Sequence, residues 1–328
     1  MEKKNRLIDA WVFIALLFVI SIATGWFNRR GVNIPLSTIP IFAGLLGFFF
    51  WVFIYRKPTA EIYSKGYPYR KLKLWGIISS VVFFEYVLIW GLHSKQIQLI
   101  DEHLYSLTVI FIGAIAFYFS FIRMRVSLRF LFLGILIPLL ASGSAVGLGR
   151  YFGFVQFSVP REDVLGIVFL NTSYWIIFGI LYQLVCEEPA FRGFLMQRLV
   201  DKGRAQAVII SSFIYAIWHI IIGIFQGINI QQGVVSFAEN FIIGCLLALL
   251  FIKGKNLLIA AISHGIIIGL KLSLLAGDKY PGLSQYFQTT TASAELKFIM
   301  LWFLCLFIGL IVVLITPEKR GPQPVFPR

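Results

Sequence analysis

The stretch from Cys186 to Gln197, CEEPAFRGFLMQ, brings three charged side chains into a region that otherwise has the composition of a lipid-buried helix. A charged side chain at the centre of a bilayer costs about 2.5–3.5 kcal/mol on insertion scales, so three close together need a reason. Glu188 and Arg192 are four residues apart and can therefore pair on one helical face. Glu187 is then left as a carboxylate without an obvious local partner, and it is our candidate for a general base.

His219 and His264 are two further ionisable side chains in later apolar segments. A single histidine on a membrane helix is more often a hydrogen-bonding partner of another helix than a ligand, but three ionisable elements at matched depths favour a shared site. Glu187, His219 and His264 are adequate ligands for Zn²⁺, with an additional carboxylate as general base. Without a metal, a desolvated Glu187 would activate water and the histidines would hold the oxyanion. Both versions describe hydrolysis of an amide within or beside the membrane.

A proton-coupled carrier is an alternative that uses the same residue types as a proton relay. Such a relay needs no glutamate pair backed by an arginine. The Glu187-Glu188 pair with Arg192 therefore favours hydrolysis over transport.

The composition defines the elements that must position these side chains. The chain has 328 residues, of which 59% are hydrophobic and only 13% charged, and its mean hydropathy is +0.84. These values predict an all-α, polytopic bundle of transmembrane helices. The net charge is +14, but the basic residues lie in short clusters between apolar runs. That pattern is typical of membrane topology and argues against a nucleic-acid partner.

Ten apolar segments of roughly 20 residues are predicted to span the bilayer. The first five lie near 8–27, 34–55, 74–92, 104–122 and 128–147, and the second five near 174–200, 205–223, 234–252, 256–275 and 297–316. The first half carries one membrane-embedded carboxylate, Glu85, for which we expect a structural hydrogen bond to a neighbouring helix. The three cysteines, in apolar surroundings without metal-type spacing, are interpreted as small buried hydrophobes.

Loop charges support this count of spans. With the N-terminus inside, the segments predicted to be inside hold 20 of the 29 basic residues, whereas the outside segments hold 7. Positive charge gathers on the cytoplasmic side of membrane proteins. We therefore expect a multi-pass protein of the cell membrane with both termini cytoplasmic. The short loops favour a bacterial source.

The segment 161–200 must break, because as one helix it would be about 60 Å long, twice the hydrocarbon thickness. We place the break at Asn171-Thr172-Ser173, whose side chains compete for backbone hydrogen bonds. This predicts an interfacial helix at about 162–171 and a span from about 174 to 200. The span has to continue to about Val200, since only then does Glu187 reach the depth of the histidines.

Three motifs in this half resemble those of a known family. Glu187-Glu188-Pro-Ala-Phe-Arg192 resembles the EExxxR motif of the CPBP intramembrane proteases, which include the type II CAAX prenyl endopeptidases and the bacterial Abi proteins. Tyr215-Ala-Ile-Trp-His219 is similar to the second motif, FxxxH, with Tyr in place of Phe. The stretch ending at His264 is similar to the start of the third motif, HxxxN. The resemblance covers about 174–275.

The resemblance implies a role for each residue. Glu187 would be the catalytic glutamate that activates water, Glu188 and Arg192 would position it, and His219 and His264 would bind Zn²⁺ or stabilise the oxyanion. It also implies a membrane-embedded peptidase acting on a peptide or membrane-protein substrate. N-terminal helices at 1–160 would precede a protease core at 161–316, and a cytoplasmic tail would follow at 317–328.

Position 268 departs from the family pattern, because Ile268 stands where the third motif has asparagine. Asn240 on a neighbouring span is a possible substitute, and the hydroxyl of Tyr215 could reach the site. The departure motivates a second hypothesis, a catalytically impaired, Abi-like protein acting in self-immunity or as a membrane scaffold.

Overall fold

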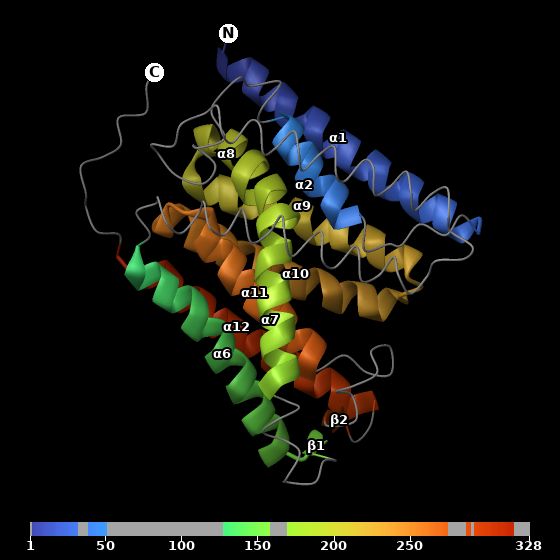
Figure 1. The fold of residues 1–328 in the computed structure, drawn as a ribbon, viewed down its shortest axis with the longest axis vertical. Coiled ribbons are helices and arrows are strands. Elements are labelled where there is room, and N and C mark those ends of the chain that lie inside the picture. Colours follow the sequence, from blue (N-terminus) through green and yellow to red (C-terminus); the bar gives the residue numbers. More distant parts are fainter. Residues whose placement is uncertain are drawn as a thin grey trace.

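The computed structural model describes residues 2–31, 39–50, 127–157, 169–274, 287–289 and 292–317. Its helices are α1 (Glu2–Arg29), α2 (Ile39–Phe49), α6 (Leu128–Tyr151), α7 (Phe169–Val185), a π-helix (Pro189–Leu195), α8 (Met196–Leu199), a 3-10 turn (Val200–Lys202), α9 (Arg204–Phe225), α10 (Ile230–Gly254), α11 (Leu257–Leu274) and α12 (Ala292–Ile315). Two short strands, β1 (Val155–Phe157) and β2 (Phe287–Thr289), pair antiparallel. Figure 1 shows the helices packed beside one another, with the strand pair at one end.

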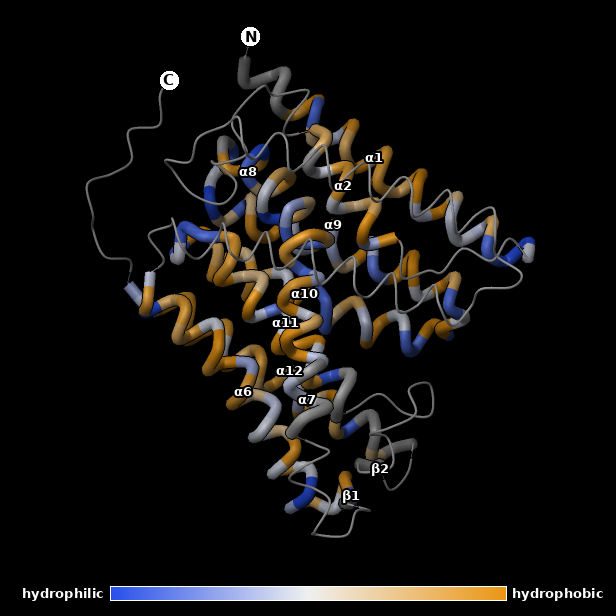
Figure 2. Tube along the Cα trace, in the orientation of Figure 1, coloured by the Kyte–Doolittle hydropathy of each residue, from blue (hydrophilic) through white to orange (hydrophobic). Residues whose placement is uncertain are grey.

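Five of the described helices, α1, α6, α9, α10 and α12, contain stretches long and apolar enough to cross a membrane, and α11 is a shorter apolar helix. In Figure 2, α1 and α6 are hydrophobic over most of their length. The prediction of an all-α membrane bundle is confirmed; the strand pair is a small element that it did not include. Two predicted spans, 74–92 and 104–122, and Glu85 lie outside the described residues.

Glycines allow α7 and α11 to pack closely. A Cβ atom on Gly265 would lie 2.3 Å from the backbone nitrogen of Ile180, and one on Gly269 would lie 2.6 Å from the backbone of Ile176. Small residues of this kind let membrane helices approach until their backbones touch. The pairs run in opposite directions along the two helices, so α7 and α11 are antiparallel. This contact places His264 beside the C-terminal end of α7.

The predicted break at 171–173 is wrong. Those residues lie inside α7, and the chain deviates from regular α-helix only after Val185, where the turn at Cys186 leads into the π-helix. Proline has no backbone N–H, so Pro189 cannot bond to the carbonyl four residues earlier. The Thr172 hydroxyl, by contrast, has no hydrogen-bond partner and does not compete for the backbone. The predicted continuation to about Val200 is confirmed, since α8 ends at Leu199.

Short connections hold α9 and α10 in place. Gly203, with φ of 120°, lies between the end of α8 and the start of α9. Asn229 and Gln232 form a reciprocal capping box that starts α10. On α9, the Trp218 Nε1–H donates to the Ser21 hydroxyl of α1 over 2.8 Å. The N-terminal helix is thereby joined directly to the helix that carries His219.

Candidate active site

The centre of the site is a hydrogen-bonded chain of Glu187, Tyr215 and His264. The Tyr215 hydroxyl donates to Glu187 Oε2 over 2.9 Å, and it lies 3.1 Å from His264 Nε2. Glu187 Oε2 is also 3.8 Å from His264 Nε2. Glu187 follows the C-terminal end of α7, Tyr215 lies on α9 and His264 lies on α11. The fold thus brings side chains from two other helices to one buried carboxylate.

Glu188 and Arg192 form the layer behind this centre. Arg192 donates to Glu188 Oε1 over 3.1 Å and to the Gly244 carbonyl of α10 over 3.4 Å. The same carboxylate oxygen lies 2.7 Å from His264 Nδ1. A carboxylate at Nδ1 fixes the orientation of an imidazole and determines which ring nitrogen faces the reaction. The predicted pairing of Glu188 with Arg192 is present, and it extends to His264.

His219 lies on the most open side of the site. Its side chain is 23% exposed, whereas the side chains of Glu187 and His264 are 4% and 3% exposed. Its Nδ1 is 3.1 Å from the carbonyl of Tyr215, one turn earlier on α9, and its Nε2 is 3.8 Å from Glu187 Oε2. His219 is therefore the side chain of the site most accessible from outside.

The π-helix and α2 position the two glutamates. Pro189 leaves carbonyls near Val185 without their usual helical partners. The backbone of α2 fits against this place, because a Cβ on Gly44 would lie only 2.1 Å from the Val185 carbonyl oxygen. One on Gly47 would lie 2.8 Å from the Cα of Ala190. The N-terminal half of the chain thus packs on the segment that carries Glu187.

Aromatic side chains enclose the ion pair. Phe191 packs edge-on against Tyr215 with ring centroids 5.0 Å apart, and it meets Trp218 at 5.2 Å. The Arg192 guanidinium lies 4.6 Å from the centre of the Tyr215 ring. Because this shell excludes water, the interactions of Glu187, Glu188 and Arg192 are stronger than they would be at a surface.

Two of the side chains predicted to bind zinc are hydrogen-bonded to a neighbouring hydroxyl in this conformation. Within the part of the chain that the structure describes, no group of three or more His, Cys, Asp or Glu side chains is arranged to hold an ion. At the predicted zinc site, the Tyr215 hydroxyl is hydrogen-bonded to both Glu187 Oε2 and His264 Nε2, two atoms that would have to face the ion. Zn²⁺ at Glu187, His219 and His264 therefore stays a prediction.

The structure brings together all five residues expected to act, namely Glu187, Glu188, Arg192, His219 and His264. The Tyr215 hydroxyl reaches the site, as expected. Asn240 is occupied elsewhere, because its amide donates to the carbonyl and hydroxyl of Ser236. Sequence reasoning missed Gln183, a buried amide one turn before Glu187. A polar residue four positions before the glutamate in an apolar run was the available signal.

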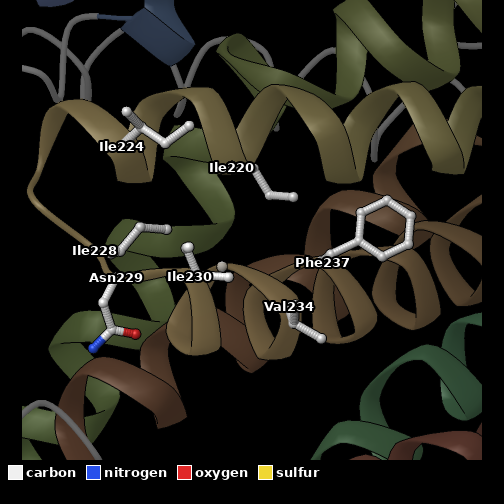
Figure 3. Close-up of a pocket in the computed structure, with 8 residues that line it drawn as sticks. Ile220, Ile224, Ile228, Asn229, Ile230, Val234 and Phe237 are labelled. Atoms are coloured by element: carbon white, nitrogen blue, oxygen red, sulfur yellow. The ribbon is translucent and has the colours of Figure 1, made fainter.

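A separate apolar pocket lies where α9 meets α10 (Figure 3). Its lining includes Ile220, Ile224 and Phe237. Ile230 and Val234 at its rim are 89% and 66% exposed, which is expected of side chains that face lipid. None of the five site residues lines this pocket.

Comparisons with known proteins give one match. The model of a family described as type II CAAX prenyl endopeptidase Rce1-like matches residues 169–269. This range begins with α7 and ends in α11, so it contains all five site residues. No curated protein and no solved structure matches the chain.

Proposed function

We propose that the chain is an intramembrane endopeptidase of the CPBP type in which Glu187 activates water. The premise is the match of residues 169–269 to the type II CAAX prenyl endopeptidase Rce1-like family. The observation that carries the proposal is the environment of Glu187. This carboxylate is only 3% exposed, has a hydroxyl at 2.9 Å and two imidazoles at 3.8 Å. It has no direct partner among the lysines and arginines of the described residues.

In the proposed reaction Glu187 acts first as general base and then as general acid. Glu187 takes a proton from water while the water oxygen attacks the carbonyl carbon of the scissile peptide bond. The new C–O bond forms as the carbonyl π electrons move to oxygen, which gives a tetrahedral oxyanion. On collapse the C=O bond re-forms, the C–N bond breaks, and the proton held by Glu187 passes to the leaving nitrogen. The products are a carboxylic acid and an amine, and Glu187 is a carboxylate again.

The neighbours of Glu187 have distinct roles in this proposal. Tyr215 orients the carboxylate through its hydroxyl. His219, on the open side, stabilises the oxyanion as an imidazolium. Its Nδ1–H donates to the Tyr215 carbonyl, and its Nε2–H is then the donor to the oxyanion. His264 is oriented by Glu188, and Arg192 balances the charge of Glu188. Removal of one partner would leave an uncompensated buried charge or acceptor.

A zinc-dependent mechanism is the alternative for the same hydrolysis. Glu187, His219 and His264 would hold the ion, which would supply Lewis-acid activation of water or of the carbonyl. The Tyr215 hydroxyl would first have to break its hydrogen bonds to two of the ligand atoms, Glu187 Oε2 and His264 Nε2. Incubation with a strong chelator followed by desalting separates the two forms. Retained cleavage supports the metal-free route, whereas loss that Zn²⁺ restores supports the metal.

The substrate and location follow from the surroundings of the site. Glu187 lies beside α9, which is long and apolar enough to cross a membrane, and α11, a shorter apolar helix, so the substrate is a membrane-associated peptide or protein. We place both termini in the cytoplasm on the basis of the loop charges, and the chain in a bacterial cell membrane on the basis of the short loops. Reporter fusions at the two ends test this orientation, and an external terminus would contradict it.

Ile268 favours a second candidate, an Abi-like self-immunity or scaffold protein with an impaired site. A cellular phenotype that is unchanged by Glu187→Ala and His219→Ala would support this candidate. The proton-coupled carrier is third. Solute uptake by proteoliposomes that Glu187→Gln abolishes would favour the carrier and count against proteolysis.

Cleavage by purified protein tests the leading proposal. A library of membrane-anchored reporter peptides is incubated with wild type and with Glu187→Ala in detergent, and the products are identified by mass spectrometry. We expect cleavage at a defined bond by wild type alone. Equal turnover by the two proteins, or no cleavage of any reporter by wild type, would overturn the proposal.

A further inference from the structure

Most hydrogen-bond donors of the site already have partners. Arg192 donates to Glu188 and to the Gly244 carbonyl. His264 uses Nδ1 toward Glu188 and Nε2 toward the Tyr215 hydroxyl. The developing oxyanion of a hydrolysed peptide needs donors that are placed before the reaction begins. Among the residues named so far, only His219 has a ring nitrogen left for it.

Gln183 is the described side-chain amide that is buried with both its nitrogen and its oxygen unpartnered. Its exposure is 0%. Other amides of the described residues do have partners. The amide oxygens of Asn229 and Gln232 accept from backbone N–H groups, and the amide nitrogen of Asn240 donates to Ser236. Burying a polar group without a partner destabilises a fold, so such a group calls for an explanation.

The position of Gln183 relates it to the reaction. It lies four residues before Glu187, and side chains at this spacing share one helical face about one turn apart. The same side of α7 packs on α11, because Ile180 and Ile176 meet Gly265 and Gly269 there. The next residue, Leu184, is also fully buried. An unpartnered amide is thus held on the α11-facing side of the helix that leads to Glu187.

We propose that the Gln183 amide N–H is a catalytic hydrogen-bond donor that stabilises the oxyanion formed when Glu187 activates water. The inference rests on the proposed hydrolysis and extends it. The amide keeps its protons throughout: it bonds to the carbonyl oxygen as that oxygen gains negative charge, and it releases the oxygen when the C=O bond re-forms. Gln183 acts together with His219.

Gln183→Leu separates catalysis from stability, because leucine has a similar size and no hydrogen-bonding atoms. A donor to an oxyanion contributes about 10²–10³-fold to kcat. We expect kcat to fall by about that factor with KM nearly unchanged. The thermal midpoint in detergent should rise by about 2 °C, since an unsatisfied amide is removed from the interior. Gln231→Leu, at an exposed position of α10, is the matched control and should leave kcat unchanged.

Three results would overturn the inference. An unchanged kcat in Gln183→Leu would do so while leaving the role of Glu187 intact. A thermal midpoint that falls together with kcat would show that the amide is a structural hydrogen-bonding group. Absence of any cleavage by wild type would overturn the proposed function itself and this inference with it, so the failure of each is distinguishable.

Discussion

Two buried glutamates of this protein have opposite surroundings. Glu239 on α10 has a lysine partner, since its Oε2 lies 2.7 Å from Lys271 Nζ on α11. Glu187 has a hydroxyl and two imidazoles around its Oε2 but no lysine or arginine in direct contact. An ammonium partner neutralises a carboxylate permanently. A hydroxyl and two imidazoles around a carboxylate leave it able to take and return a proton, as a general base must.

The two regions also differ in burial. The Lys271 side chain is 46% exposed, whereas those of Arg192 and Glu188 are 2% and 0% exposed. Exposed ion pairs contribute little to stability, because water screens them and their side chains lose entropy. Breaking a buried pair leaves a charge without compensation. The difference predicts a graded series of mutational effects, in which the α7 site is far more sensitive than the α10–α11 pair.

Arg192→Met should have the largest effect on stability. It leaves the Glu188 carboxylate buried without its cation, which costs about 3–5 kcal/mol. The measurement is the loss of thermal midpoint in detergent, compared with Lys271→Met. Equal shifts in the two variants would contradict the distinction between the regions.

Gly44→Ala should have the next largest effect and lower the free energy of unfolding by about 3 kcal/mol, the upper end of overpacking effects. The new methyl group would lie 2.1 Å from a backbone oxygen of Val185, which cannot move away as a side-chain end could. Activity should fall as well, because Val185 adjoins the segment that carries Glu187. Gly143→Ala on α6 is the control.

A Cβ on Gly143 would meet no heavy atom within 4 Å. Alanine there should be neutral or stabilising by up to about 1 kcal/mol, because alanine is the better helix former. Opposite signs for the two glycine variants are therefore expected in the same melting experiment. A tolerated Gly44→Ala would show that α2 does not hold the π-helix.

Tyr215→Phe should cost about 1–2 kcal/mol, since Glu187 loses a buried hydrogen bond. The effect on turnover should be larger, about 10–100-fold in kcat, because the carboxylate is no longer oriented. Cleavage kinetics and thermal melting of the same preparation measure the change in kcat and the change in stability. If melting changes and kcat does not, Tyr215 is a packing residue only.

Lys271→Met should have the smallest effect, below about 1 kcal/mol, because the pair is half-exposed. Glu239→Gln should match it. Cleavage should be unaltered in both variants. A large loss of kcat in either would show that the α10–α11 pair belongs to the catalytic machinery.

The sequence was sufficient to predict which side chains converge. Intramembrane charges are costly, so Glu187, Glu188 and Arg192 could be interpreted as a site, and matched depths joined them to His219 and His264. The place of the helix irregularity was not predictable in the same way. The competition expected at 171–173 depends on where each side chain points. The missing N–H of Pro189 is visible in the sequence, but it does not show that the chain continues as a π-helix rather than ending there.

Contacts between distant segments were beyond sequence reasoning. Nothing in the pattern around Gly44 shows that its backbone lies against Val185, because such contacts depend on how the helices are arranged in space. The absence of a partner for Gln183 likewise follows only from its full surroundings. Asn240 was expected to substitute for the missing asparagine, but its amide nitrogen donates to Ser236 instead.

The most direct test of the account compares Glu187→Gln with Glu239→Gln in one cleavage assay. Both changes remove a buried negative charge and keep the side-chain shape, but only the first removes the general base. We expect Glu187→Gln to lose at least about 10²–10⁴-fold in kcat, the usual contribution of a general base, with its fold retained in melting experiments. Glu239→Gln should keep kcat within about twofold. Equal kcat values for Glu187→Gln and wild type, in a protein that does cleave its reporter, would contradict the account.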